Sequence, residues 1–378
     1  MAGIGVSLLL IRTELISFSR PLEISKSVLD WESKHNTETN PEFSMDTFRK
    51  LHTWNGQIPR TNLIILTYMR SGSTLTGGMF DQHPDVFYVF EPIHSLNWIW
   101  RSHFKLLSYF DRPSRRITSS DSFAELAIDI AEAFLRCRPD KIDIATLNQD
   151  HFNYSKNTIP YLECLKVNPG VLGMLNCLSI LQNQCSQSNV SVVKTIRLQM
   201  EAVETMMKSN PSLKVVHLVR DPRPTIRSQM GVNSSWSNLD SYSKKHCLKV
   251  QKDLEVTNRL MKSHPDRTKL LLYEDLVAYP AKTVKDLFSF VGLVYTRDTE
   301  IFVQSKTNSS TGEPCQVCIR EGNSTSISLQ WRQQFDFENT RIIDANCKPV
   351  YQMLGYLPAN SRNELMDLSK SLKIDREF

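Results

Sequence analysis

The sequence has little excess charge of either sign. Its 45 Lys and Arg residues against 40 Asp and Glu leave a net charge of +5 over 378 residues. This balance excludes an acidic disordered tail, and it is too mild for a protein that coats nucleic acid. A slight basic excess is compatible with anionic ligands, but it does not select a function. The length is sufficient for a large hydrophobic core.

Cysteine is also scarce. The eight cysteines are too few for a small fold held together by disulfides. Cys315 and Cys318 form one C-x-x-C pair, whereas a zinc site would need a second pair at matching spacing, and the sequence has none. For this pair a loop disulfide and free thiols both stay open. An entry into the secretory pathway is favoured by N-x-[ST] sequons at Asn153, Asn189, Asn233, Asn308 and Asn323.

No apolar run reaches the roughly 20 residues of a membrane span. The run from Ala2 to Ile11 is interrupted by Arg12 and Glu14, so it is either part of a signal-anchor or an amphipathic start. The predicted organisation is a short apolar segment, a polar stem, one large domain with a mostly helical insertion, and a polar tail: residues 1–18, 19–58, 59–360 (insertion at about 100–190) and 361–378.

What the sequence does contain is a strand that leads into a loop of small residues. Residues 62–67 are apolar and β-branched, which is typical of a strand buried on both faces of a parallel sheet. Arg70 opens the loop, and a helix is predicted over 75–80. This order directs backbone N–H groups at an anion, and Gly72 lets the backbone approach it. Hydroxyl donors to the anion are Ser71, Ser73 and Thr74.

A second strand, residues 213–219, leads into a second turn. Pro224 in that turn suits the first turn of a helix, and Arg220 and Ser228 can bracket another anion. Two strand-to-helix anion sites imply a ligand with phosphate-like groups at two places, bound beyond the carboxyl ends of the strands. The sequence therefore predicts an α/β fold with a P-loop-like parallel β-sheet flanked by helices.

Both loops belong to a series of short motifs that spans about residues 60 to 357. The motifs are Arg70–Thr74, His83–Tyr88, Phe90–Pro92, Val193–Leu198, Val219–Arg223 with Ser228, Tyr273–Leu276, Trp331–Arg332, Cys347 and Leu354–Tyr356. In this order they resemble sulfotransferases that use 3′-phosphoadenylyl sulfate, above all the Golgi carbohydrate 6-O-sulfotransferases acting on galactose, N-acetylgalactosamine and N-acetylglucosamine. Thr74 replaces a Ser that is frequent in that family, and residues 307–322 depart from its pattern.

The resemblance implies a transfer of sulfuryl groups from 3′-phosphoadenylyl sulfate to a sugar hydroxyl. Sulfate monoesters carry less charge than phosphates, and the sequence has no cluster of metal ligands, so no metal ion is expected. Glu91 stands where related Golgi enzymes use a general base, with His94 as the alternative, and Lys194 where a lysine neutralises the leaving phosphate. Arg70 is expected to act in catalysis as well as in binding. The expected nucleotide contacts are Arg70, Ser71, Gly72, Ser73, Thr74, Arg220, Asp221, Arg223, Ser228 and Tyr273.

Cations alternate with aromatic residues between Trp98 and Arg116. Such a patch can hold a sugar chain, although a solvated basic face gives the same pattern. His94, Arg101 and Lys105 are the predicted acceptor contacts.

The predicted partners are a nucleotide donor and a glycan acceptor, with no nucleic acid. The predicted location is the Golgi, with a type II-like weak anchor or as a soluble lumenal or secreted protein. A sulfotransferase for another acceptor, such as protein tyrosine, is an alternative. So are an inactive glycan-binding protein and a P-loop kinase-like protein, the last opposed by the missing Gly-Lys-[Ser/Thr] and Mg²⁺-binding acid.

Overall fold

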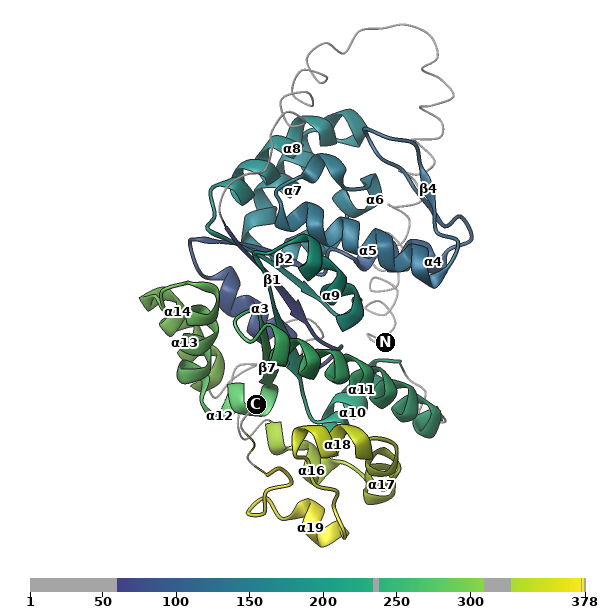
Figure 1. Cartoon of the computed structure of the whole chain (residues 1–378), viewed down its shortest axis with the longest axis vertical. Helices are drawn as coiled ribbons and strands as arrows, with labels where there is room; N and C mark the ends of the chain where they lie inside the picture. Colours follow the sequence, from purple (N-terminus) through teal and green to yellow (C-terminus); the bar gives the residue numbers. More distant parts are fainter. Residues whose placement is uncertain (1–59, 234–237, 309–327, 375, 377–378) are drawn as a thin grey trace, which may run out of the picture. The chain divides into compact units, whose positions relative to one another are not determined.

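The computed structural model describes residues 60–233, 238–308, 328–374 and 376. The chain forms two compact units. Unit 1 comprises Met1–Arg60 and Phe87–Val193, and unit 2 comprises Thr61–Val86 and Lys194–Phe378. Each unit is described by itself, with the elements labelled as in Figure 1.

Unit 2 is built on three parallel strands. β1 (Thr61–Leu66) pairs with β6 (Leu213–Val219), and β6 pairs with β7 (Thr268–Leu272). The β1 side chains from Leu63 to Leu66 are fully buried, as the apolar run predicts. Because the strands are parallel, their carboxyl ends lie at one edge of the sheet. The residues that follow them therefore meet at this edge, which is where both anion loops begin.

Helices connect and cover these strands. They are α3 (Ser73–Asp81), α9 (Met200–Ser209), α10 (Pro222–Asn233), α11 (Leu239–Ser263), α12 (Tyr273–Ala278), α13 (Pro280–Val291) and α14 (Arg297–Asn308). Gly292 caps the end of α13 with a φ of 80°, the left-handed conformation in which many helices end. The predicted α/β fold with a parallel sheet flanked by helices is confirmed.

Short helices follow near the C-terminus, drawn in yellow tones in Figure 1; among the described residues they include α16 (Trp331–Gln334), α17 (Phe337–Asn346), α18 (Lys348–Leu354) and α19 (Arg362–Met366). The disulfide Cys247–Cys347 joins them to α11. The buried Arg332 guanidinium donates hydrogen bonds of 2.7–2.9 Å to four backbone carbonyls, those of Glu364, Leu365, Asp367 and Lys370. The segment predicted as a polar tail is thus fastened to unit 2 at these residues.

Unit 1 contains most of two strands and a set of helices. β2 (Val86–Phe90) and β5 (Val190–Thr195) are neighbours. The backbone N–H groups of Tyr88 and Phe90 donate to the side chains of Asn157 and Ser155, which satisfy them without another strand. The main helices are α4 (His94–Arg101), α5 (Ser120–Leu135), α6 (Ile144–Leu147), α7 (Ile159–Val167) and α8 (Gly170–Ser186).

The remaining elements of unit 1 are short. They are the two-stranded pair β3 (Leu106–Leu107) and β4 (Arg115–Arg116) and the 3₁₀ turns η1 (Pro139–Lys141), η2 (Asp150–Tyr154) and η3 (Lys156–Thr158). The stretch of about 100–190 is thus mostly helical.

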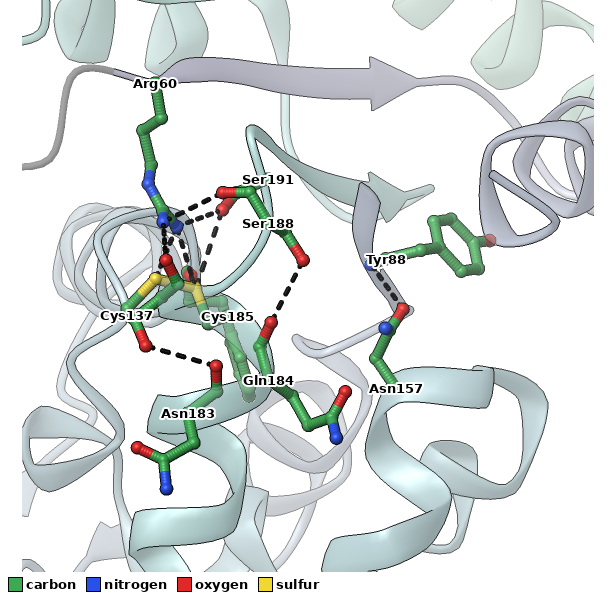
Figure 2. The surroundings of a disulfide bond; sticks show 11 residues. Arg60, Tyr88, Cys137, Asn157, Asn183, Gln184, Cys185, Ser188 and Ser191 are labelled. Carbon is green, nitrogen blue, oxygen red and sulfur yellow. Dashed lines mark hydrogen bonds between the residues drawn. A yellow bond between two sulfur atoms is a disulfide. The ribbon is translucent and has the colours of Figure 1, made fainter. Parts of the chain in front are cut away.

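Two disulfides stabilise unit 1. Cys137 pairs with Cys185, and Cys164 pairs with Cys177. Figure 2 shows the Arg60 guanidinium directed toward the first of these bonds, where it also donates to Ser191 Oγ at 2.9 Å and to the Ser188 carbonyl at 3.1 Å. Neither pairing follows from the sequence. The predicted loop pair Cys315 and Cys318 lies outside the described residues.

Within the described residues, none of the helices combines the length and the apolar character that a membrane crossing requires.

Candidate active site

The loop after β1 has the geometry of an anion cradle. Arg70 and Gly72 have φ values of 68° and 85°, so the chain reverses sharply before α3 begins at Ser73. No side chain caps α3, and its first N–H groups are therefore open to an external acceptor. The Gln229 side chain holds the loop from α10 by donating to the Met69 carbonyl at 2.6 Å.

The two predicted anion loops are joined in unit 2. Arg70 Nε donates to Ser228 Oγ at 2.8 Å, and an Arg220 Nη donates to the Arg70 carbonyl at 3.2 Å. The Arg220 guanidinium lies 4.4 Å from the centre of the Tyr273 ring, a distance typical of a cation–π contact. Residues that follow three neighbouring strands thus form one site.

Two polar atoms of this site are buried without a partner among the described residues. They are the hydroxyl of Ser71 and the Nε of Arg220. A buried donor without an acceptor is costly, and such atoms in a native fold call for a ligand or an ion. The chemistry of the set, two guanidinium groups, a hydroxyl and uncapped helix N–H groups, fits a ligand with phosphate or sulfate groups.

Gly72 packs directly against Tyr273, and this contact yields the first prediction. A Cβ at Gly72 would lie 2.1 Å from Tyr273 Cδ2, and the φ of 85° is itself strained for any other residue. Gly72→Ala should therefore displace the ring or the loop and weaken binding of adenosine 3′,5′-bisphosphate about tenfold or more, which corresponds to the 1–3 kcal/mol of such strain. Isothermal titration calorimetry measures the effect.

The matched control is Gly231→Ala in α10, where an added Cβ meets no atom within 4 Å. That variant should bind the nucleotide like the wild type and be equally or slightly more stable. A double variant, Gly72→Ala with Tyr273→Ala, removes the clash with the ring but keeps the backbone strain at position 72, so it separates these two causes of weaker binding. Unchanged affinity in Gly72→Ala would show that the ring contact does not shape the site.

The buried carboxylate of Glu274 holds the start of the second loop in place. Glu274 Oε1 accepts the Asp221 backbone N–H at 3.0 Å, and Glu274 Oε2 accepts the Tyr356 hydroxyl at 2.7 Å. Burial and the nearby Asp221 raise the pKa of Glu274. The carboxylate therefore ties the start of α10 to the chain that follows α18.

Arg223 is fully buried and satisfied within the protein. Its guanidinium binds Asp221 at 2.7–3.2 Å, donates to the Leu357 carbonyl at 2.9 Å, and lies 5.1 Å from the rings of both Trp331 and Tyr351. Both Asp221 and Arg223 are predicted nucleotide contacts, and that contact stays a prediction. Asp221 and Arg223 bind each other, and Arg223 also binds the Leu357 carbonyl. These bonds stabilise the loop that carries Arg220.

Glu91 directly follows β2 in unit 1, whereas Lys194 belongs to unit 2 and is the last residue but one of β5. Lys194 is 3% exposed near the end of β5, and the next residue, Thr195, accepts the Thr67 backbone N–H at 3.1 Å. Glu91 is also 3% exposed and has a φ of 48°, which is rare for a residue other than glycine. Its carbonyl accepts the His94 backbone N–H at 3.0 Å, so the turn brings Glu91 and the start of α4 together.

His94 adjoins a group of aromatic rings that the sequence does not reveal. The His94 ring lies 3.8 Å from the His151 ring, between centroids, and His151 in turn contacts Phe90 and Tyr154. Tyr154 is 48% exposed. His151 comes from η2, more than fifty residues beyond His94, and no local pattern marks it. Such a surface is suited to the apolar face of a sugar ring.

The two remaining acceptor candidates lie at and after the end of α4. Arg101 is exposed in the last turn of α4. Lys105 has a φ of 46°, and its ammonium lies 4.4 Å from the centre of the Trp100 ring. The structure thus pairs Lys105 with an aromatic side chain, as the alternating pattern suggests.

A buried polar network that the sequence also does not reveal lies behind the first loop. The Tyr68 hydroxyl donates to Asp253 Oδ2 at 2.8 Å and lies 2.9 Å from His217 Nε2. His217 Nδ1 lies 2.7 Å from the Thr257 hydroxyl. Burial and the charge of Lys249 lower the pKa of His217 to about 3, so this ring is neutral at physiological pH. The network fixes Tyr68, two residues before Arg70.

Taken together, the parallel sheet and its two joined loops define an α/β protein that binds an anionic nucleotide-like ligand. Residues 62–297 match the Sulfotransferase family, and the chain belongs to this family. It is therefore an enzyme of the class that transfers sulfuryl groups from 3′-phosphoadenylyl sulfate, and the predicted resemblance is confirmed.

Relatives with related names cover most of the chain. The chain is 26% identical to carbohydrate sulfotransferase 5 of Mus musculus over 361 residues, which cover 84% of this chain and 86% of that protein. It is 27% identical to carbohydrate sulfotransferase 1 of Homo sapiens over 378 residues, with coverage of 90% and 88%.

Solved structures give weaker similarities. The sulfotransferase domain of the Synechococcus PCC 7002 olefin synthase matches with a TM-score of 0.40 and 19% identity, over 76% of this chain and 94% of that one. Mouse sulfotransferase SULT7A1 complexed with PAP matches with a TM-score of 0.36 and 11% identity, over 86% and 94%.

Proposed function

We propose that this protein sulfates a glycan, at the 6-hydroxyl of galactose, N-acetylgalactosamine or N-acetylglucosamine, with 3′-phosphoadenylyl sulfate as the donor. The observation that supports this most directly is the joining of two anion loops in unit 2 through Arg70, Ser228 and Arg220. One loop with a helix N-terminus suits the phosphosulfate, and the other suits the 3′-phosphate. Ser73 and Thr74 add hydroxyl donors at the first turn of α3.

Arg70 and the N–H groups of the loop would stabilise the negative charge that develops on the oxygen between sulfur and the 5′-phosphate. Lys194 is the second cation assigned to this charge. The acceptor oxygen forms a bond to sulfur as the bond to the bridging oxygen breaks, and adenosine 3′,5′-bisphosphate leaves. By analogy with phosphoryl transfer, positioning and charge stabilisation carry the catalysis. We predict that this chemistry needs no metal ion.

Glu91 is the proposed general base, which takes the proton of the sugar hydroxyl as the new bond forms. Its burial and its strained backbone support this role, because strained residues accumulate at functional sites. His94, Arg101 and Lys105 are the proposed acceptor contacts, and the exposed Tyr154 beside His151 adds an aromatic surface to them.

The proposed location is the lumen of the Golgi. The three disulfides of the described residues support an oxidising compartment, because such bonds are rare in the cytosol. Anchoring through residues 1–18 stays a prediction.

One sulfation assay tests both the proposed function and the role of Glu91 as the general base. Purified protein with labelled donor should sulfate desulfated keratan or chondroitin, and Glu91→Gln should lower kcat about 10²- to 10⁴-fold, the range expected for loss of a general base. Affinity for adenosine 3′,5′-bisphosphate, measured by calorimetry, should stay unchanged in this variant, because the base does not hold the nucleotide.

His94→Ala is the matched comparison. If it loses the activity while Glu91→Gln keeps it, His94 is the base and the assignment to Glu91 is wrong. Two further assays use the same labelled donor. In one, a tyrosine peptide replaces the glycan as the acceptor, and in the other, EDTA removes metal ions from the glycan assay. Transfer to the peptide alone would contradict a sugar acceptor, and loss of activity with EDTA would contradict catalysis without metal. Stabilisation by ATP with Mg²⁺ but not by the bisphosphate would contradict the donor.

A further inference from the structure

A cavity of about 200 Å³ opens in unit 2. It lies between the start of α9 and one face of α11, and three lysines contribute to its lining, Lys245, Lys249 and Lys252. Their spacing along α11 places them on the same side of that helix. None of these three residues belongs to the predicted site.

Hydrogen bonds connect the cavity to the edge of the sheet where the donor loops begin. Asp253, which also lines the cavity, accepts the Met200 backbone N–H at 2.7 Å and the Tyr68 hydroxyl at 2.8 Å. Lys249 Nζ donates to the carbonyl of Ile196, the residue after β5, at 3.4 Å. The cavity therefore lies beyond the carboxyl ends of β1 and β5, the usual location of ligands in such folds.

The lining combines three kinds of group. The side chains of Lys245 and Lys252 are exposed, and they form no ion pair or hydrogen bond with other described residues. Glu201 and Asp253 supply carboxylate oxygens, which accept hydroxyl hydrogens, and Leu248 is 51% exposed beside them. A sugar ring offers an apolar face and several hydroxyls, so the carboxylates and the leucine suit it.

The charge and the size of the cavity reduce the range of ligands that it suits. The three ammonium groups outnumber the two carboxylates by one, which suits a single sulfate or carboxylate better than a polyphosphate. Its volume of about 200 Å³ is below the roughly 300–1,000 Å³ of sites for drug-sized ligands, so one monosaccharide unit fits better than a nucleotide.

We propose that this cavity is a subsite for an anionic sugar residue of the acceptor, one that already carries a sulfate or a carboxylate. This inference rests on the proposed function, because it assumes that the acceptor is a glycan. Lys245 and Lys252 bind the anionic group, while the exposed Glu201 accepts a hydroxyl of the same ring. The enzyme would then prefer chains that are already charged over neutral ones.

The test uses the full chain and two keratan oligosaccharides of equal length. One is desulfated, and the other carries sulfate on neighbouring residues but keeps a free 6-hydroxyl on the acceptor sugar. The wild type should show a higher kcat/KM on the sulfated oligosaccharide. Lys245→Ala with Lys252→Ala should reduce that value about tenfold, a modest effect because exposed charges are screened, and leave kcat/KM on the desulfated one unchanged. The matched control is Lys244→Ala with Lys262→Ala, which removes two exposed lysines of α11 outside the cavity.

Three results would overturn the subsite: a wild type that does not distinguish the two chains, an equal loss on both chains in the cavity variant, or the same loss in the control. If the wild type sulfates neither chain, the proposed function fails instead. The subsite is then decided by calorimetry with the sulfated oligosaccharide alone, whose binding should be weakened in the cavity variant and not in the control.

Discussion

Replacing Arg70 with alanine should lower kcat for sulfuryl transfer about 10²- to 10³-fold, the effect of removing one preorganised donor from a developing charge. Arg70 is held for this task by its bond to Ser228 Oγ and by the bond from Arg220 to its carbonyl. A side chain fixed in this way loses little entropy when the charge appears. Steady-state kinetics with saturating donor measure the change.

Arg70→Lys separates charge from geometry. Lysine keeps the positive charge, but it lacks the planar group that donates to Ser228 and that would let Arg70 bind the donor at the same time. We expect an intermediate loss. The control is Arg259→Ala, because Arg259 forms an exposed ion pair with Glu204 at 2.8 Å, and this change should leave kcat unchanged. If Arg70→Ala raises KM for the donor with kcat unchanged, Arg70 only binds the donor.

The sequence predicts the sheet of unit 2 well because its signals are local. The strand predicted over 213–219 is β6, and the strand predicted over 62–67 is β1 within one residue at each end. A run of apolar, β-branched residues specifies a buried strand without reference to its partners. The first loop follows from the same logic, since a strand, small residues and a helix determine where the backbone N–H groups point.

Contacts between distant residues could not be predicted in this way. The disulfide between Cys247 and Cys347 and the four carbonyls around Arg332 join segments whose patterns are independent of each other. Periodicity shows which face of a helix is buried, but it does not identify the residues that cover that face. For the same reason the segment over 361–378 reads as a polar tail, although the structure fastens Leu365 in the core.

In the candidate site, the sequence predicts some residues correctly and does not reveal how they contact one another. The sequence singles out Arg70 and Ser228, but it assigns them to different anions, whereas the structure bonds them to each other. It does not single out Gln229, which holds the loop, because a glutamine on a helix carries no distinctive signal. Whether Asp221 and Arg223 touch a ligand depends on side-chain directions, which no spacing specifies.

Replacing Arg223 with alanine should reduce the free energy of unfolding by about 3–5 kcal/mol, the usual effect of removing one partner of a buried ion pair. The change leaves Asp221 and Asp344 buried without their cation, which lies 2.7 Å and 3.6 Å from them. It also empties the space between the rings of Trp331 and Tyr351. Urea unfolding under oxidising conditions measures the loss, and the control Arg259→Ala, which removes one partner of an exposed ion pair, should leave the free energy of unfolding nearly unchanged.

The pH dependence of this loss identifies its cause. Burial raises the pKa of Asp344, and the charge of Arg223 opposes that rise, so the pKa should rise further in Arg223→Ala. A carboxyl whose folded pKa exceeds its unfolded value binds more protons in the folded state, and stability then increases as the pH falls toward the unfolded value. The deficit of the variant should therefore shrink between about pH 7.5 and pH 5. A constant deficit over this range would mean that lost packing, and not the unpaired carboxylates, destabilises the protein.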